Sequence, residues 1–465
     1  MFSVLIRPLR EPDALTSYKW RNDPEIWLNT GRRPERQITE QIETEWIRKV
    51  LAEEDSARFA IVADNTYIGN IQITNIKPGE EGEYHIFIGD KNYWGKGIAT
   101  LASLQLIRYA REKLGLKRLY LTVKPQHEAA ISVYRKCGFV KVSEEVKMVC
   151  DLVCVPIAAV SVFMITYNHE DYIRQSVESV LYQKANFDFD IVIGEDCSTD
   201  GTRSVIKAIA DEYPGKFRLL FHVKNLGANV NQLTVFNACT GKYIAMCEGD
   251  DYWTATDKLQ KSVDFLEQNP SYSLVCTDYG ILDQSTGTVT ENYLRRKYDL
   301  ATEKDVLLRE YMFSRHAIRS LTAVMRGSEV RAYFGETDSR ITHSSAAGDL
   351  PLWLFIMSIS KVRFLPISTA MYRVNPGTGS RPESIHKRKQ FRDGICEILE
   401  YYIDKNNLPD RFRRKLKLQR TIDAMEYYRD TGDRTKMWKS FFSSGLRGFT
   451  SRRALAIIVA RGSNN

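Results

Sequence analysis

The stretch Tyr243-Ile244-Ala245-Met246-Cys247-Glu248-Gly249-Asp250-Asp251-Tyr252-Trp253 decides how the second half of this chain folds. An apolar run, typical of a buried strand, is followed at once by three carboxylates. Carboxylates grouped at the end of a buried strand repel one another, and a hard cation is the physical reason for such a group. A cation held by few protein oxygens keeps positions for phosphate. The stretch predicts a metal–diphosphate site of Glu248, Asp250 and Asp251, with a solvated acidic turn as the alternative.

Strands and helices alternate upstream of this stretch. Such alternation predicts right-handed crossovers and a mostly parallel sheet. Ligands of such sheets bind at the carboxyl ends of the strands. The predicted strands are 160–165, 189–193, 217–222 and 243–247, and the predicted helices are 172–183, 203–212 and 230–238.

Polar residues follow two of these strands at the same predicted edge of the sheet. A carboxylate there can accept from a base N–H or from ribose hydroxyls, and a threonine or tyrosine can cover a base. We expect Thr166 and Tyr167, together with Glu195 and Asp196, to face a nucleoside. Asp200 fits better as the cap of the following helix.

The first part of the chain, to about residue 150, carries a separate αβ pattern. Its strand-like runs are 59–62, 67–71, 85–88 and 119–123, and its helical patterns are 98–113 and 129–137. The loop Tyr93-Trp94-Gly95-Lys96-Gly97-Ile98-Ala99-Thr100 links a strand to a helix. Its glycines let the backbone approach a ligand, and amide donors at a helix N-terminus suit a pyrophosphate. A turn that only starts the helix is the alternative.

The run Lys124-Pro125-Gln126-His127-Glu128-Ala129-Ala130-Ile131-Ser132-Val133-Tyr134-Arg135-Lys136-Cys137-Gly138-Phe139 comes later. Together with the glycine loop it resembles the acetyl-CoA-binding and C-terminal motifs of the GNAT acyltransferases, over residues 3–150. The start, with Ile6-Arg7-Pro8-Leu9 and Trp20-Arg21-Asn22-Asp23-Pro24, resembles the branch that acetylates protein N-termini and nucleotide-linked amino sugars. The resemblance implies acetyl-CoA as cofactor, bound by Trp94, Gly95, Lys96, Gly97, Ile98, Ala99, Thr100 and His127.

The resemblance also implies that Tyr134 protonates the leaving thiolate. A phenol with a pKa of about 10 is close enough to a thiol to share its proton. A core aromatic residue is the alternative for Tyr134. Glu83 and His85 are candidate bases for the acceptor ammonium, because strand alternation places both on one face. An ordinary surface carboxylate and histidine are the alternative for this pair.

The segments 162–170, 191–202, 225–229 and 248–251 resemble, in order and spacing, the family 2 glycosyltransferases of the GT-A fold, over residues 158–380. The resemblance implies a nucleotide-sugar donor, with UDP favoured, and Mg²⁺ or Mn²⁺ on the diphosphate. The implied substrate-binding residues are Thr166, Tyr167, Asn168, Glu195, Asp196 and Asn225.

The catalytic base of that family lies beyond the metal motif, before an aromatic helix. Asp349, in Ala347-Gly348-Asp349-Leu350-Pro351-Leu352-Trp353, occupies this place. A helix N-cap is the alternative role. One base and direct displacement predict inversion at the anomeric carbon.

Composition bounds the class of protein. Hydrophobic residues make up 43% and charged residues 27%, as in ordinary globular chains. No apolar run is long enough to span a membrane, and the eight cysteines form no Cys-x-x-Cys pair. The net charge of +8 comes from residues 385–465, where 19 Lys and Arg outnumber 9 Asp and Glu. This basic tail favours peripheral contact with an anionic membrane or a packed helical subdomain, and the rest gives no sign of nucleic-acid binding.

The sequence therefore predicts an α/β chain in three parts. Residues 1–152 form a GNAT domain, 156–382 a GT-A domain with a Rossmann-like, mostly parallel sheet, and 383–465 a basic helical region. We expect a cytoplasmic bifunctional enzyme, at the inner face of the cell membrane if its tail binds lipid. It acetylates an amino sugar or nucleotide-linked amino sugar and transfers a sugar to a surface polysaccharide or lipid-linked glycan. In the alternatives, the first half acetylates proteins, or one half is degenerate and only binds.

Overall fold

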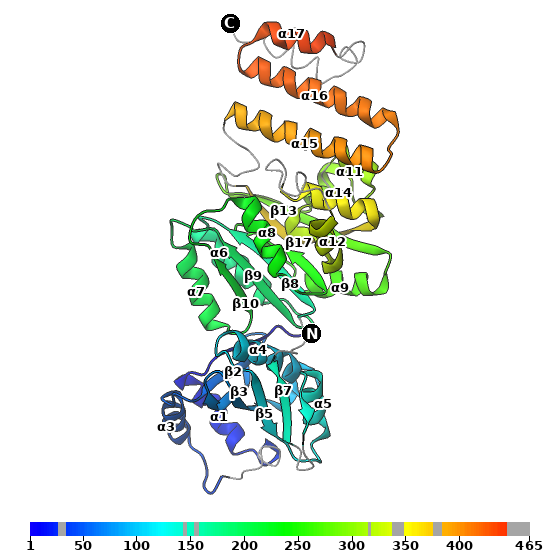
Figure 1. The fold of residues 1–465 in the computed structure, drawn as a ribbon. Coiled ribbons are helices and arrows are strands. Elements are labelled where there is room, and N and C mark those ends of the chain that lie inside the picture. The colour runs from blue at the N-terminus through cyan, green and yellow to red at the C-terminus, as the bar shows by residue number, and fades with distance from the viewer. Residues whose placement is uncertain are drawn as a thin grey trace. The chain divides into compact units, whose positions relative to one another are not determined.

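The computed structural model divides into two compact units, shown as a ribbon in Figure 1. One unit holds residues 1–225 and 234–267, and the other holds residues 226–233 and 268–465. The described residues are 1–26, 34–142, 147–152, 158–314, 318–336, 348–374 and 384–443.

The first unit begins with a sheet whose described strands follow the order β1-β2-β3-β4-β5-β7-β6. Neighbouring strands are antiparallel except β4 and β5, which are parallel. The register between β4 and β5 covers only Glu81–Glu83, so the rest of β4 leaves its neighbour. The strands are Val4–Pro8, Ala57–Ala63, Thr66–Lys77, Glu81–Ile88, Arg118–Thr122, Val140–Lys141 and Lys147–Asp151, from β1 to β7.

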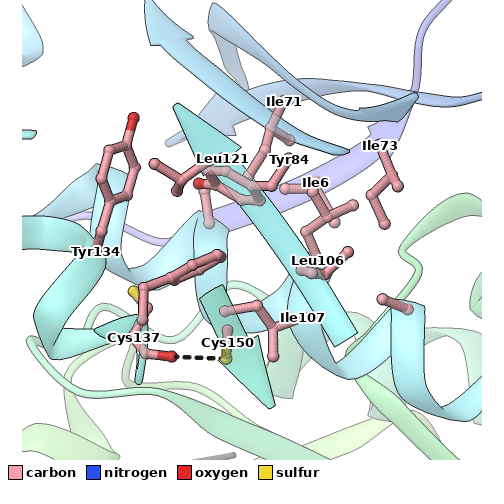
Figure 2. Packing of buried hydrophobic residues seen from close by; sticks show 14 of the residues in the cluster. Ile6, Ile71, Ile73, Tyr84, Leu106, Ile107, Leu121, Tyr134, Cys137 and Cys150 are labelled. Carbon is pink, nitrogen blue, oxygen red and sulfur yellow. Dashed lines mark hydrogen bonds between the residues drawn. The ribbon is translucent and has the colours of Figure 1, made fainter. Parts of the chain in front are cut away.

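Helices α1 (Ala14–Arg21), α3 (Glu40–Leu51), α4 (Ile98–Glu112) and α5 (Glu128–Lys136) accompany this sheet. Helix α4 buries Ile98, Ala102, Leu106 and Ala110, a four-residue spacing that places all of them on one face. That face joins Ile71, Tyr84 and Leu121 from the sheet in one apolar core, part of which is drawn in Figure 2. The core therefore fixes the helix that begins at the glycine loop.

The same unit contains four parallel strands in the order β10-β9-β8-β11. Their bounds are Phe217–Phe221, Phe189–Glu195, Val160–Thr166 and Tyr243–Met246. Helix α6 (Glu170–Leu181) follows β8, and α7 (Thr202–Glu212) follows β9. The parallel register aligns Thr166 with Glu195, so both predicted nucleoside loops begin at one edge of the sheet.

A group of charged side chains is buried between α4 and the residues that directly precede β9 and β10. Arg108 of α4 pairs with Asp188, and Lys216 Nζ lies 3.4 Å from Asp188 Oδ1. All three side chains are almost fully buried. Burial lowers the pKa of Lys216 to about 8, while Asp188 opposes this change. A buried group of this kind depends on every partner, because removing one leaves an uncompensated charge.

The second unit is built on β13 (Tyr272–Asp283) and β17 (Lys361–Val374), which run parallel. Strand β16 (Val324–Arg326) pairs antiparallel with β13. Three helices bear on the site described below: α10 (Tyr293–Tyr298), α12 (Gly327–Glu336) and α14 (Leu350–Ile359). The apolar residues of α14 are buried along its length, which fixes the position of Asp349 at its start.

The C-terminal part is helical, as the sequence predicted. Helices α15 (Ile385–Lys405), α16 (Asp410–Asp430) and α17 (Arg434–Ser443) lie in succession in Figure 1. Ile422, Met425, Met437 and Phe441 form a small core between the last two. Among the described residues no helix combines the length and the apolar character needed to cross a bilayer. Most of the basic and aromatic segment 435–459 falls beyond residue 443, outside the described residues.

The predicted strands and helices are confirmed, with shifts of a few residues at their ends. Helix α6 begins at Glu170 rather than at residue 172, and β11 ends at Met246 rather than at residue 247. Such shifts are expected because helix and strand ends depend on local capping. The sequence pattern did not locate the long strands β13 and β17, which carry polar residues as well as apolar ones.

Candidate functional site

The glycine loop forms an open backbone surface ahead of α4. Gly95 has a φ of 72° and Gly97 a φ of 77°, a region that L side chains rarely adopt. A Cβ added at either glycine would meet no heavy atom within 4 Å, so the space beside both is open. Gly97 is the N-cap of α4 and offers no side chain to its amides. The loop therefore presents amide donors and a helix dipole, as a pyrophosphate requires.

Side chains around this loop are held in place without covering it. The Trp94 indole donates to the carbonyl of Ile88 at 2.9 Å, and the Lys96 ammonium lies over the rings of Phe2 and Tyr93. His127 directly precedes α5, and its side chain gives no cap to that helix. The predicted acetyl-CoA contacts of Trp94, Lys96 and His127 stay predictions.

Tyr134 lies at the edge of the apolar core. Its ring packs edge-on against Tyr84 with centroids 5.8 Å apart, and Figure 2 shows its hydroxyl pointing away from the other labelled side chains. Burial raises the pKa of Tyr134 to about 12, with a smaller contribution from Cys137. The phenol is therefore protonated at physiological pH and available as a donor. The core-aromatic alternative holds for the ring, and it leaves the hydroxyl free to act as the predicted acid.

Glu83 and His85 lie on one face of β4, as strand alternation predicted. Glu83 Oε1 is 3.8 Å from His85 Nε2, and Thr74 Oγ1 lies 3.0 Å from the same nitrogen. Burial lowers the pKa of His85, Glu83 opposes this change, and Arg58 adds to it. The imidazole is therefore neutral at pH 7 and can accept a proton. Glu83 is the last residue of β4 in register with β5, and His85 lies just beyond this point, which the sequence pattern did not reveal.

The loops after β8 and β9 are tied together by side chains. Asn168 is at a φ of 55°, and its side-chain oxygen accepts from the Thr199 amide at 2.8 Å. In return, Ser198 Oγ accepts from the Asn168 amide at 3.0 Å. Asp200 accepts from the Thr202 amide at the start of α7, in agreement with the predicted capping role. These reciprocal bonds hold the two loops at a fixed separation.

The predicted nucleoside ligands differ in exposure. Tyr167 is 42% exposed, and its ring is accessible to a base. Glu195 is fully buried, and its carboxylate accepts from the Ser198 amide at 2.5 Å and from Arg203. Asp196 is also buried, and its carbonyl accepts from the Asn225 amide group at 3.1 Å. In this structure Glu195 braces the loop, and a direct contact with the nucleoside stays a prediction.

The acidic turn after β11 packs against the end of β8. A Cβ at Gly249 would lie 2.5 Å from Thr166 Oγ1, so no side chain fits there. His169 Nδ1 lies 3.1 Å from Thr166 Oγ1, and His169 Nε2 lies 3.9 Å from Asp250 Oδ2. His169 thus links the first loop to the acidic turn. The sequence did not single it out, because the contact crosses a gap of some 80 residues in the chain.

The three predicted metal ligands are not equivalent. Asp250 and Glu248 are partly exposed, whereas Asp251 is buried. Among the described residues no three His, Cys, Asp or Glu side chains are grouped closely enough to hold a metal ion. The donor set fits an ion such as Mg²⁺ in part. Asp250 and Glu248 offer two partly exposed carboxylates, and one or two carboxylates suffice when phosphates supply the other ligands. Asp250 is the best placed of the three, and the complete metal site stays a prediction.

Asp349 directly precedes α14, at the position that the sequence assigned to the base. Its side chain makes no capping hydrogen bond to the helix. Burial raises the pKa of the Asp349 carboxyl, and the Trp353 indole and the Arg319 guanidinium oppose this rise. A carboxylate with a raised pKa binds a proton more readily, which favours a base over a cap.

Comparison with known families identifies two domains along the chain. Residues 3–140 match the model described as acetyltransferase (GNAT) domain, and residues 161–321 match the model of glycosyl transferase family 2. Both families predicted from the sequence are confirmed, together with the α/β class of each domain.

Curated relatives each cover one part of the chain. A Mycobacterium tuberculosis protein of uncharacterized function is 40% identical over 116 residues, which are 25% of this chain and 33% of that protein. TuaG of Bacillus subtilis, named for a glycosyltransferase of teichuronic acid biosynthesis, is 32% identical over 29% of this chain and 52% of its own length. Spermidine N(1)-acetyltransferase of Escherichia coli is 29% identical over 30% of this chain and 73% of its own. The chain thus spans about a third of the first relative and half of the second.

Two solved structures each cover part of this chain. Spermidine N-acetyltransferase from Vibrio cholerae, in complex with CoA and spermine, covers 32% of this chain and 92% of its own, with 22% identity and a TM-score of 0.28. S. aureus TarS 1–349, in complex with UDP, covers 58% of this chain and 80% of its own, with 16% identity and a TM-score of 0.37.

Proposed function

We propose, from the premise that this chain joins a GNAT acetyltransferase domain to a family 2 glycosyltransferase domain, that both domains are catalytic. The observation that supports the proposal is that each domain has loops whose geometry suits its expected ligand. In the first domain this is an open glycine loop ahead of α4, together with the Tyr134 hydroxyl, which points away from the other core side chains labelled in Figure 2. In the second domain it is a pair of cross-linked loops against which the turn of Asp250 is packed.

In the first site the acceptor amine loses a proton and attacks the thioester carbonyl of acetyl-CoA. His85, neutral at pH 7 and beside Glu83, takes that proton directly or through water. The carbon–sulfur bond breaks, and Tyr134 donates its proton to the departing thiolate. Amides of residues 95–100 hold the pyrophosphate away from the reacting atoms. We propose an amino sugar, free or linked to a nucleotide, as the acceptor.

In the second site the donor is a nucleotide sugar, with UDP favoured. Tyr167 covers the base. Asp250 and Glu248 would hold Mg²⁺ or Mn²⁺, and the ion would supply positive charge to neutralise the departing diphosphate. Asp349 removes the proton of the acceptor hydroxyl, and a single displacement inverts the anomeric carbon. The acceptor class is a surface polysaccharide or a lipid-linked glycan, in keeping with the name of the TuaG relative. Peripheral membrane contact through the basic tail belongs to this proposal.

A second acetyl acceptor is favoured by one observation. A relative that shares 73% of its own length with this chain is named for spermidine, which makes a polyamine a rival to the amino sugar. Acetyl-CoA should therefore be incubated with nucleotide amino sugars, spermidine and a peptide, using Asp250→Ala protein to silence sugar transfer. Acetylation of a nucleotide amino sugar supports the proposal, and acetylation of spermidine or the peptide alone refutes it.

The donor is tested separately. Hydrolysis of UDP-, GDP- and dTDP-sugars should be followed with Mn²⁺, first with the unaltered chain and then with Asp250→Ala. We expect release of one nucleotide class by the unaltered chain only. Hydrolysis that survives the substitution would show that Asp250 holds no catalytic ion.

A further inference from the structure

The second unit carries a cationic and aromatic surface that the proposed chemistry does not use. Helix α10 has the sequence Tyr293-Leu294-Arg295-Arg296-Lys297-Tyr298, and only Leu294 of these residues is buried. The helix is short, but its position is fixed. The buried Asp278 of β13 accepts from the Leu294 amide at 2.8 Å and from the Arg295 amide at 3.1 Å.

Tyrosines connect this helix to Arg319. Tyr279 of β13 is buried, and its ring lies 5.5 Å from that of Tyr293. On its other side, Arg319 Nε donates to Tyr279 Oη at 3.3 Å. The Arg319 guanidinium lies 5.4 Å from the ring centroid of Tyr372. Lys297 Nζ donates to Tyr293 Oη at 2.5 Å. The cations and rings therefore form one connected patch.

The Arg319 side chain retains hydrogen-bond donors for a ligand. Its backbone is fixed, because its carbonyl accepts from both the amide and the hydroxyl of Thr322. Its side chain is exposed, and its two terminal nitrogens make no hydrogen bond to any described residue. A guanidinium with a free fork matches the two oxygens of a carboxylate or a phosphate.

One member of the patch, Arg319, interacts electrostatically with the predicted base. The field of Arg319 reaches the carboxyl of Asp349, the predicted base. Under the proposed function, a group held at Arg319 belongs to the acceptor that Asp349 would deprotonate. Exposed tyrosines beside cations also suit an extended glycan, because rings provide apolar contact area at low entropic cost.

We infer that Arg319 and the α10 patch (Arg295, Arg296, Lys297, Tyr293 and Tyr298) bind an anionic glycan acceptor, one that carries carboxylate or phosphate groups along its chain. This inference rests on the proposed glycosyl transfer and narrows its acceptor class. Charge complementarity selects the occupant, since four cations face solvent, and Asp278, the carboxylate that contacts α10, is buried and bonded to backbone amides.

The test uses binding, so that it does not depend on turnover. The full chain is titrated with three probes of equal length: a uronic-acid oligosaccharide, a polyol-phosphate oligomer and a neutral chito-oligosaccharide. We expect one anionic probe to bind about 10-fold or more tightly than the neutral one, with affinity falling as salt rises. The two anionic arms separate carboxylate from phosphate as the recognised group.

Variants locate the binding. Arg319→Gln should weaken the anionic probe about 10-fold, and Arg319→Lys should recover part of this loss, since it restores charge without the fork. Arg331→Gln, on the exposed side of α12, is the matched control and should have no effect. Equal affinity for neutral and anionic probes, or equal losses in Arg319→Gln and Arg331→Gln, would overturn the inference.

Two outcomes separate this inference from its premise. Donor hydrolysis by the unaltered chain is measured in the same samples, and its absence with every donor would count against glycosyl transfer while leaving the binding result intact. Vesicles of phosphatidylglycerol form the last arm. Binding to vesicles that falls in Arg319→Gln, with neither oligomer bound, would assign the patch to a membrane and overturn the glycan assignment.

Discussion

The two candidate sites of this chain differ in that one is formed by backbone and the other by side chains. The loop ahead of α4 offers backbone: two glycines at positive φ, with open space beside each of them. The loops after β8 and β9 offer side chains that hold one another, as Asn168 does with Ser198 and Thr199. The first site therefore depends on the absence of side-chain atoms, and the second depends on particular groups. Adding an atom should damage the first, whereas removing one should damage the second.

The largest expected effect belongs to the side-chain site. Asp250→Asn keeps the volume of the side chain and removes its charge. We expect glycosyl transfer to fall about 10³-fold, because the diphosphate loses the cation that neutralises it. Acetyl transfer by the same protein should not change. The control is Asp257→Asn, a partly exposed residue that forms an ion pair with Lys261, and an equal loss there would contradict the assignment.

The next effect concerns the proposed acid of the first site. Tyr134→Phe should lower kcat for acetyl transfer about 10²-fold while the Kd of acetyl-CoA stays the same. Because the pKa of Tyr134 is raised to about 12, its protonated form persists as pH rises. The unaltered chain should show no basic decline from this group up to about pH 10.

Tyr109→Phe is the control, on α4 and packed against Phe59. A decline near pH 10 that disappears in Tyr134→Phe would show a phenol with an ordinary pKa. That result would remove the physical basis for a permanently protonated acid.

A smaller effect tests the glycine loop itself. Gly97→Ala and Gly115→Ala both place a methyl group at positive φ in open space, with φ of 77° and 63°. Each should cost about 1 kcal/mol of stability, since the backbone strain is the same. Only Gly97→Ala should also weaken acetyl-CoA binding, about 10-fold, since its methyl group enters the space for pyrophosphate. Equal affinities in the two variants, measured by calorimetry, would argue against a cradle.

The smallest effect measures how far the loops hold each other. Asn168→Gly preserves the permitted φ and removes bonds to the Thr199 amide and hydroxyl. We expect a loss of about 1 kcal/mol in the free energy of unfolding by denaturant. Asn65→Gly, at a φ of 63° in the turn between β2 and β3, is the matched control and should lose less. Similar losses would mean that the cross-links add nothing.

Sequence alone located most helices and strands of the two αβ patterns, and it placed its candidate residues at the ends of strands, because both follow from local pattern. Apolar runs set the strands, and polar residues at their ends, such as Thr166 and Asp250, fall at one edge. The sequence did not show that His169 contacts both Thr166 and Asp250, or that Arg203 forms an ion pair with Glu195. Pairing of side chains from different segments depends on how the chain packs. The parting of β4 from β5 was likewise invisible, because no residue marks it.

Arg319 is another residue whose contacts the sequence did not reveal. No residue near Arg319 along the chain points to a binding role. That role is inferred from its contacts with Tyr279 and Tyr372, which lie on strands distant from it in sequence. Conversely, the three carboxylates that the sequence treats alike separate in the structure, where Asp251 is buried and Asp250 is not. Equivalent residues in a motif become unequal once burial is known.

The central claim is that one chain carries two independent donor sites, and a single calorimetric series tests it most directly. The unaltered chain is titrated with acetyl-CoA, then with UDP, GDP or dTDP in the presence of Mn²⁺, and then in the reverse order. We predict one acetyl-CoA and one manganese-dependent nucleotide per chain, with the same affinities in either order. Absence of either ligand, or displacement of one by the other, would contradict the account.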